Sequence, residues 1–286
     1  MQELVEKASI LIEALPYIKK FRGKELLIKY GGSALTFEDI RGNVLRDLVF
    51  LNYVGIKTIL IHGGGMFITE NLKKRGVTSQ FVNGLRVTTK ETMEVVNDTL
   101  ADLNMKIVHD INRYGARAIG LSGHDAEILN VVKHTAEGDV GYVGDVTSVN
   151  LTPLKELTEF NIIPVIYPIG IDEKGEAYNV NADEAAAKIA VAMGVQKLLV
   201  LTNVRGIMTD PADENSLLSS VSADEVQSLI DRKVVTGGMI PKVRSCMTAL
   251  RGGVKKAHII DGRIPHSLLL EIFTDQGIGT EIYLPA

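Results

Sequence analysis

The sequence lacks the residues needed for a disulfide, a common zinc site or a membrane span. Its single cysteine, Cys246, has no intramolecular partner, and its six histidines form no HExxH pair. No stretch approaches the roughly 18 consecutive apolar residues of a transmembrane helix. These absences predict a soluble protein of the reducing cytoplasm, with Cys246 as a small apolar core residue and no membrane partner.

A strong charge of either sign is also missing. Lys and Arg number 31 against 35 Asp and Glu, the formal net charge is −4, and no local basic patch stands out. Nucleic acid is therefore not an expected partner. The hydrophobic content of 45% over 286 residues is ordinary for a globular protein, and it suffices for one large α/β domain or two small ones.

Three familiar site motifs are absent as well. No GxxxxGK[ST] phosphate loop occurs, and no GxGxxG dinucleotide motif follows an expected strand. GLSGH at 120–124 misses the GxSxG nucleophile elbow, because His124 stands where the last glycine belongs. A P-loop NTPase and an NAD enzyme are thus excluded, and a serine hydrolase has only weak support.

What the sequence does contain is an alternation of short apolar runs and longer helical segments. Segments 38–54 and 89–112 have helical periodicity, and such alternation indicates a mainly parallel sheet covered on both faces. We therefore predict the α/β class, as a three-layer αβα sandwich. The glycine-rich residues 128–150 predict one or two hairpins over a sheet edge. The expected strands are 25–30, 57–62, 116–121, 162–167, 197–202 and 257–260.

Two of these strands end in consecutive glycines, in IKYGG at 28–32 and IHGGG at 61–65. In open α/β sheets, ligands bind at the carboxyl ends of the strands. Glycines there either turn the chain or let backbone N–H groups approach an anion. Lys29 lies at the end of the first strand, separated from the first glycine pair only by Tyr30, and Lys242 lies near the helix start expected at TGGMIP. Both lysines can neutralise an anion, and a solvent-exposed lysine is the alternative at each position.

Two further polar stretches are candidates for the same site. NVNADEAA at 179–186 places Asn179, Asn181 and Asp183 before an alanine-rich helix, where a helix cap explains one of the three. The aspartate can orient lysine ammonium groups or organise a magnesium ion, and Asn179 can bind a polar substrate. Arg86 in FVNGLRVTT suits a carboxylate, although a surface arginine is the simpler interpretation.

Together these stretches resemble the acetylglutamate kinase group of the amino acid kinase family. The resemblance runs in order from about residue 24 to the C-terminus, and TGGMIPK and LRGGVKKAHIIDGR are its most specific parts. The other similar stretches are IKYGGS, IHGGG, NGLRVT, GLSGHD, NVNADEAA and LTNVRGI. The resemblance implies transfer of the ATP γ-phosphoryl group to the side-chain carboxylate of N-acetyl-L-glutamate, the second step of arginine biosynthesis, with Mg2+ accompanying the nucleotide.

The resemblance also implies roles for individual residues. Lys29 and Lys242 would neutralise charge on the moving phosphoryl group, and Asp183 would hold both lysines in place. The backbone at 63–65 would approach the phosphoryl group too closely for a Cβ. No side chain is assigned as a direct metal ligand. The residues implied in binding the acetylated amino acid are Gly64, Gly65, Arg86 and Asn179. Those implied in binding the nucleotide are Gly31, Gly32, Thr202, Asn203, Gly206 and Met239.

An amphipathic helix is expected ahead of the first strand. Its apolar residues at helical spacing are Leu4, Ala8, Leu11, Ile12 and Leu15. We expect three segments: this helix over 1–22 for oligomerisation, an amino-acid-substrate lobe over 23–180 and an ATP-binding lobe over 181–286, the two lobes forming one continuous domain. The helix resembles the N-terminal extension of arginine-sensitive members, which implies a ring-shaped homohexamer inhibited by arginine. Whether a nitrogen-signalling protein docks on the ring is left open.

Three residues depart from the family pattern. Met66 stands where a proline usually follows the three glycines, Ser33 where asparagine is frequent, and Asn203 where LTDV has its aspartate. Met66 would loosen the loop, and Asn203 removes a charge from the nucleotide lobe. One alternative function is another kinase of this fold, acting on aspartate, glutamate, carbamate or uridylate, against which NGLRVT and NVNAD argue. The other is a non-catalytic arginine-binding regulator, against which the joint presence of the two lysines and the aspartate argues.

Overall fold

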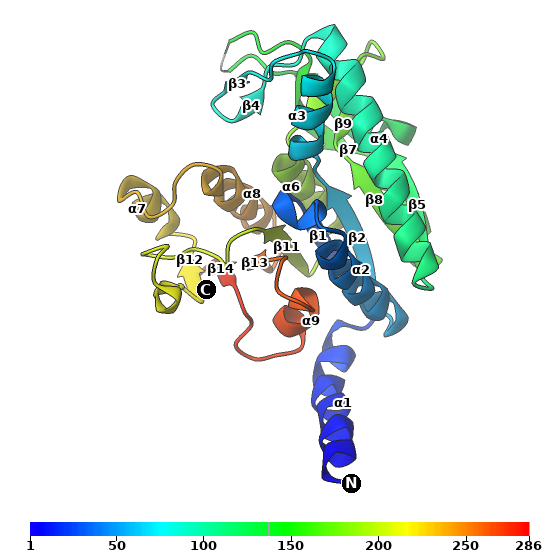
Figure 1. Ribbon diagram of the computed structural model, residues 1–286, viewed down its shortest axis with the longest axis vertical. Coiled ribbons are helices and arrows are strands. Elements are labelled where there is room, and N and C mark those ends of the chain that lie inside the picture. Colours follow the sequence, from blue (N-terminus) through cyan, green and yellow to red (C-terminus); the bar gives the residue numbers. More distant parts are fainter. Residues whose placement is uncertain (137, 286) are drawn as a thin grey trace.

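An eight-stranded, mainly parallel sheet lies at the centre of the computed structural model, which describes residues 1–136 and 138–285 (Figure 1). Its order is β12-β14-β13-β11-β1-β2-β8-β5, and among these strands β13 and β14 pair antiparallel. The α/β prediction is confirmed, and the six expected strands are present within one residue at either end. The strands are β1 (Glu25–Tyr30), β2 (Lys57–His62), β5 (Arg117–Ser122), β8 (Ile162–Tyr167), β11 (Lys197–Thr202), β12 (Ser220–Ser222), β13 (Lys256–Asp261) and β14 (Thr280–Tyr283).

Helices cover both faces of the sheet and create two hydrophobic cores. Side chains alternate along a strand, so Leu26 and Ile28 of β1 enter one core and Leu27 enters the other. The same alternation points Lys29 toward the second core and His62 of β2 toward the first. The helices of the first core include α2 (Glu38–Tyr53), α4 (Lys90–Arg113) and α9 (Ser267–Ile272). Those of the second include α5 (Thr152–Glu159), α6 (Ala182–Met193) and α8 (Met239–Arg251).

The strand pairing of residues 128–150 differs from the expected hairpin. β6 (Leu129–Lys133) and β7 (Val143–Val149) do form an antiparallel pair, but β9 (Ile169–Ile171) and β10 (Ala177–Val180) join them in a small closed barrel. Two glycines of these strands, Gly144 and Gly170, allow the close packing, and a Cβ on Gly170 would lie 2.3 Å from a side-chain carbon of Val131. β9 and β10 pair antiparallel with each other, and both were missed because they are short and their other barrel partners, β6 and β7, lie far away in sequence.

Smaller elements surround the carboxyl ends of the strands. The helix α3 (Gly65–Lys74) begins within the second glycine cluster, and a short hairpin, β3 (Phe81–Val82) with β4 (Leu85–Arg86), follows it (Figure 1). The remaining elements are α7 (Val226–Asp231) and the 3-10 helices η1 (Gly32–Leu35), η2 (Asp125–Glu127) and η3 (Glu214–Ser216).

The helix α1 (Gln2–Phe21) projects away from the rest of the chain (Figure 1). Its C-terminal end is attached, because Tyr17 donates a 2.6 Å hydrogen bond to Asp275 and Phe21 is buried. Leu11 and Ile12, from the expected apolar stripe, are 69% and 68% exposed, whereas the side chain of Leu4 lies outside the described part. No helix among the described residues is long and apolar enough to cross a membrane.

Candidate active site

The two glycine clusters lie side by side at the carboxyl end of the sheet. Tyr30 and His62, the last residues of β1 and β2, are partners in the parallel register. Immediately beyond them, the N–H of Gly63 donates a 2.9 Å hydrogen bond to the carbonyl of Tyr30. The sheet therefore places the first glycine cluster against the second, as strand ends at a common edge require.

Lys29, Lys242 and Asp183 form one buried cluster beside these loops. The Nζ of Lys29 lies 2.8 Å from Oδ1 of Asp183, and the Nζ of Lys242 lies 3.0 Å from Oδ2. Their side chains come from β1, the first turn of α6 and the first turn of α8, and the Asp183 side chain is 8% exposed. Asn181 caps α6 by accepting from the N–H groups of Asp183 and Glu184. The cap leaves the Asp183 carboxylate free to bind both ammonium groups.

The electrostatics of this cluster favour a bound anion. Burial lowers the pKa of Lys29, against the attraction of Asp183, and the nearby charge of Lys242 lowers it further. Burial alone would raise the pKa of Asp183, but the two lysines outweigh it, and that pKa is lowered. Two ammonium groups and one carboxylate leave a net charge of +1 in a site shielded from water. An anion would relieve this imbalance.

The glycines near the cluster exclude a side chain for different structural reasons. A Cβ on Gly31 would lie 2.4 Å from the Lys29 Nζ, so this glycine makes room for the lysine. A Cβ on Gly64 would lie 2.5 Å from a methyl carbon of Leu100, whereas one on Gly65 would meet nothing within 4 Å. The expectation that a ligand excludes every Cβ at 63–65 is therefore too simple. Packing against α4 accounts for Gly64, and only open space adjoins Gly65.

Arg86 is a buried cation that no described carboxylate neutralises. It is 7% exposed, and its guanidinium donates to the carbonyl of Gly65 at 2.9 Å and to the hydroxyls of Thr69 and Ser79. The guanidinium also stacks over the ring of Phe81, 4.7 Å from its centroid. Burial lowers its pKa. A planar cation held only by neutral groups is well suited to a carboxylate ligand.

Asn179 is linked to the backbone of Arg86 by hydrogen bonds. Its Nδ2 donates to Oγ1 of Thr88 at 3.2 Å, and that hydroxyl donates to the carbonyl of Arg86 at 2.8 Å. A cavity of about 210 Å3 brings these groups together with Lys29 and Asp183 of the lysine cluster, whereas Lys242 does not line it. The predicted site residues that line it are Lys29, Gly31, Gly32, Gly64, Gly65, Arg86, Asn179 and Asp183.

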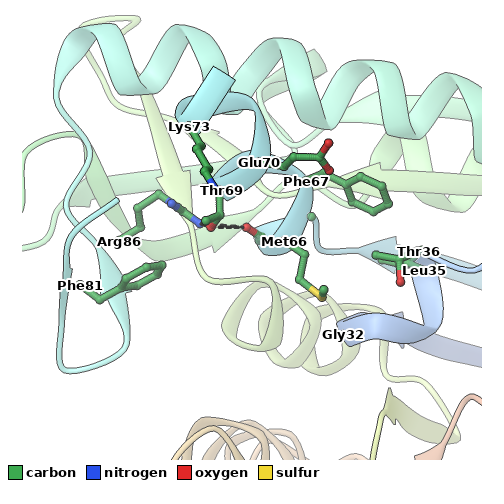
Figure 2. Close-up of a pocket in the computed structure, with 12 residues that line it drawn as sticks. Gly32, Leu35, Thr36, Met66, Phe67, Thr69, Glu70, Lys73, Phe81 and Arg86 are labelled. Carbon is green, nitrogen blue, oxygen red and sulfur yellow. Dashed lines mark hydrogen bonds between the residues drawn. The ribbon is translucent and has the colours of Figure 1, made fainter. Parts of the chain in front are cut away.

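A second and larger pocket, of about 660 Å3, adjoins this cavity on the side of α3. Figure 2 shows Arg86 and Phe81 at one end of it and Leu35 and Thr36 at the other, with Met66 between them. The Met66 side chain is 55% exposed, so a residue that departs from the family pattern lies in the pocket wall. The side chain of Ser33, another such residue, lies outside the described part.

The expected nucleotide residues lie around the adjacent end of β11. Thr202 ends this strand, and a Cβ on Gly32 would lie 3.8 Å from the backbone nitrogen of Asn203. Met239 is the first residue of α8. A Cβ on Gly206 would lie 2.4 Å from Oγ1 of Thr280, so packing against β14 explains this glycine without a ligand. Thr202, Asn203, Gly206 and Met239 do not line the 210 Å3 cavity.

We also looked among the described side chains for a group that could hold a metal ion. Within residues 1–136 and 138–285, no group of three or more His, Cys, Asp or Glu side chains is placed to hold one. Asp183, the one carboxylate at the lysine cluster, already binds two ammonium groups. A magnesium ion at this site would therefore depend on oxygens of a bound phosphate ligand.

Two structural features beside the site were not expected from the sequence. His62 and Asn104 form a buried polar chain behind Gly63. The only feature of the sequence that pointed to it was a histidine at the end of a strand. At the C-terminal end of α1, a pocket of about 550 Å3 contains Glu271, Asp275 and Glu281. Its residues come from six separate segments of the chain, which a single sequence does not connect.

Comparisons with known proteins agree with this geometry. The profile of the Amino acid kinase family matches residues 24–261. Acetylglutamate kinase from Pelotomaculum thermopropionicum is 51% identical to this chain, over 97% of the chain and 98% of that protein. Acetylglutamate kinase from Geobacter sp. strain M21 is 50% identical, over 99% of each.

Solved structures share the fold as well. N-acetylglutamate synthase from Neisseria gonorrhoeae, complexed with coenzyme A and N-acetyl-glutamate, superposes on 98% of this chain with a TM-score of 0.87 and 26% identity. This chain spans 64% of that synthase. Carbamate kinase from Giardia lamblia, at 14% identity and a TM-score of 0.64, has the same fold. The chain belongs to the amino acid kinase family.

Proposed function

We propose that the protein is an acetylglutamate kinase, which transfers the γ-phosphoryl group of ATP to the side-chain carboxylate of N-acetyl-L-glutamate. The observation that carries this proposal is the placement of Lys29 and Lys242 on the two oxygens of one buried aspartate, beside Arg86 and two glycine loops. The names of the full-length relatives at about half identity supply the acetylated substrate.

The roles follow from charge and position. Arg86, a buried cation without a carboxylate partner, binds the α-carboxylate of the substrate, and Asn179 offers its amide oxygen to the acetamido N–H. Both groups are fixed before substrate arrives, since each is hydrogen-bonded to neighbouring side chains or backbone. The side-chain carboxylate of the substrate is then directed toward the lysine cluster, where it acts as the nucleophile.

The lysine cluster stabilises the migrating phosphoryl group. Phosphoryl transfer requires mainly positioning and neutralisation of charge, and little covalent work by the protein. Lys29 and Lys242 approach from β1 and α8, and Asp183 keeps their ammonium groups apart and oriented. Gly31 and Gly32, with Thr202, Asn203 and the start of α8 at Met239, surround the nucleotide, and Gly206 holds the chain beyond Asn203 against β14. Mg2+ bound together with the nucleotide would supply further neutralisation of charge.

The test is ADP release by the purified protein with N-acetylglutamate, glutamate or aspartate. We expect ADP release with the acetylated substrate, and a loss of about 10²-fold or more in kcat for Lys242→Met, which removes one ammonium group. The matched control is Lys106→Met, because Lys106 is an exposed lysine of α4 outside the site. Release with glutamate or aspartate instead would assign another kinase of the family, and no release with any of them would overturn the proposal.

The same proposal includes feedback inhibition by arginine in the pocket beside α1. Tyr17, Lys197 and the carboxylates of Glu271, Asp275 and Glu281 line this pocket. Carboxylates suit the guanidinium of arginine, and lysine suits its carboxylate. A structure of the Neisseria synthase, with a TM-score of 0.81 to this chain, is described as complexed with L-arginine. The uncovered apolar residues of α1 support assembly of several copies, which we propose to be a homohexamer.

Two variants separate assembly from inhibition. Deletion of residues 1–20 removes most of α1, so we expect a smaller oligomer by light scattering and a weaker response to arginine. Glu281→Gln removes one carboxylate of the pocket without changing α1, so we expect an unchanged mass and a weaker response. An arginine response that survives both changes would contradict the proposed pocket.

A further inference from the structure

A buried polar chain lies behind the Gly63–Gly65 loop, on the side away from the lysine cluster. His62 is fully buried at the end of β2, and its Nδ1 is 2.9 Å from the carbonyl oxygen of Gly63. Its Nε2 is 3.1 Å from Nδ2 of Asn104, which is 3% exposed in α4. The same Nδ2 lies 2.9 Å from the carbonyl oxygen of Val165 in β8.

The hydrogen-bonding capacity of these groups fixes the position of each proton. The carbonyl of Val165 can only accept, so the amide of Asn104 must direct its NH2 group toward it. The second N–H of that group then donates to Nε2 of His62, which must be unprotonated. The ring proton therefore lies on Nδ1 and is donated to the carbonyl of Gly63. Burial lowers the pKa of His62 to about 4, so the ring is neutral near pH 7.

The hydrogen bond to the Gly63 carbonyl also sets the direction of the Gly64 N–H, because the two groups belong to one rigid trans peptide. The carbonyl of one residue and the N–H of the next lie in the same peptide plane and, in a trans peptide, point in opposite directions within it. With the Gly63 carbonyl directed back to His62, the N–H of Gly64 is directed the other way, toward the cavity that Gly64 lines. Among the described residues, no acceptor takes this N–H. It is a donor left for a ligand.

We propose that His62, with its tautomer set by Asn104, is a positioning residue that aims the Gly64 N–H at the anion in the active site. This inference rests on the proposed kinase function for the identity of the anion, a substrate carboxylate or the transferring phosphoryl group. The histidine touches neither; it acts through the Gly63–Gly64 peptide. Its neutrality leaves the charge of the site to Lys29, Lys242 and Arg86.

The surrounding residues are arranged to keep this chain in place. Gly120 of β5 makes room for it, because a Cβ there would lie 2.0 Å from Oδ1 of Asn104. The N–H of Gly63 is fixed independently by the carbonyl of Tyr30. The loop is thus held on both sides of Gly63, and the His62 bond sets the orientation of the peptide that follows.

Two substitutions at His62 test the proposal by steady-state kinetics. His62→Asn can place its Nδ2 near the position of the original Nδ1 and retain the donor, whereas His62→Leu removes it. We expect kcat to fall about 10²-fold in His62→Leu, and by about 10-fold or less in His62→Asn, with the KM for ATP changed little in either. Equal kcat values for the wild type and His62→Leu would overturn the proposal.

A matched control comes from the opposite end of the sheet. Asn52, which is 5% exposed, and the exposed Asn161 form another amide pair, at 3.1 and 3.2 Å, beyond the amino end of β8. Asn52→Leu removes a buried amide far from the glycine loop, so we expect a lower Tm with an unchanged kcat per folded molecule. If Asn52→Leu lowers kcat as much as His62→Leu does, the effect is general destabilisation and the proposal fails.

The tautomer itself can be measured without any substitution. Nitrogen-15 NMR of labelled histidine in the intact wild type should show His62 with a protonated Nδ1 and a bare Nε2 from pH 5.5 to 8. A protonated Nε2, or an imidazolium at pH 7, would overturn the proposal, even if His62→Leu does not fold. This readout does not depend on activity. A wild type that fails to release ADP would refute the proposed function, and the tautomer would still decide the inference.

Discussion

Replacing Asp183 by asparagine is the most informative single change to the lysine cluster. The carboxylate accepts from Lys29 at 2.8 Å and from Lys242 at 3.0 Å, and all three side chains are at most 17% exposed. Asparagine has nearly the same shape but only one acceptor oxygen, so it can hold one ammonium group and must present its NH2 to the other. The net charge of the cluster rises from +1 to +2.

The expected loss of stability follows from these contacts. At an effective dielectric constant near 20, each contact at about 3 Å corresponds to roughly 5 to 6 kcal/mol of gross attraction, which desolvation of the ions offsets in large part. Removing one partner of a buried pair costs about 3 to 5 kcal/mol, and the remaining amide oxygen favours the lower figure. For a chain of 286 residues, about 3 kcal/mol corresponds to a fall of roughly 6 °C in Tm.

The loss of stability caused by Asp183→Asn should become smaller as pH rises. The pKa of Lys29 is already lowered by burial, and loss of the carboxylate lowers it further. A lysine whose folded pKa lies below its unfolded value makes the folded state more stable as pH rises. Thermal unfolding of both proteins between pH 7 and 9.5 should therefore show the Asp183→Asn deficit shrinking with pH, and ADP release at pH 7 should fall about 10²-fold. A deficit that is constant with pH, with kcat within twofold of wild type, would refute this reasoning.

Three other substitutions test the substrate side, the first glycine loop and a buried carboxylate. Arg86→Lys keeps the charge but loses the planar fork, so we expect the KM for N-acetylglutamate to rise about 10- to 100-fold with a smaller change in kcat, measured by ADP release. Gly31→Ala puts a Cβ 2.4 Å from the present position of the Lys29 Nζ, so kcat should fall at least 10-fold while Tm changes little; an unchanged kcat would contradict the required close approach. Burial raises the pKa of Asp47 to about 6, so folding favours the protonated form of this carboxyl. A shift of roughly two units corresponds to about 3 kcal/mol of stability, which is fully present below about pH 4 and is lost as pH rises through 6. Asp47→Asn should therefore flatten the Tm of the protein between pH 4 and 6, as followed by circular dichroism.

Much of the sheet could be predicted because its strands are buried on both faces. Runs such as ELLIKY and KLLVLT are apolar almost throughout, and the helices between them carry clear periodicity, so the α/β class needed no partner information. The small barrel could not be predicted in this way. Its β9 and β10 are three and four residues long and contain Gly170, so their pairing with β6 and β7 depends on contacts that local pattern does not encode.

The candidate site divides in the same way. Lys29, Lys242 and Asp183 could be predicted from their positions at the end of a strand or near a helix start, and the structure brings them together in one ion cluster. The reason for Gly64 was not accessible, because Leu100, which excludes its Cβ, lies a full helix later in the chain. His62 and Asn104 were missed for the same reason: a proton position depends on three-dimensional contacts across β2, α4 and β8.

The central claim is that two lysines from distant parts of the chain act on one transferring phosphoryl group. A crystal structure with N-acetylglutamate, MgADP and a planar metal-fluoride mimic of the phosphoryl group measures this directly. We expect the Nζ atoms of Lys29 and Lys242 both within about 3 Å of the fluoride atoms. Ammonium groups that point into separate cavities, away from the mimic, would contradict the account.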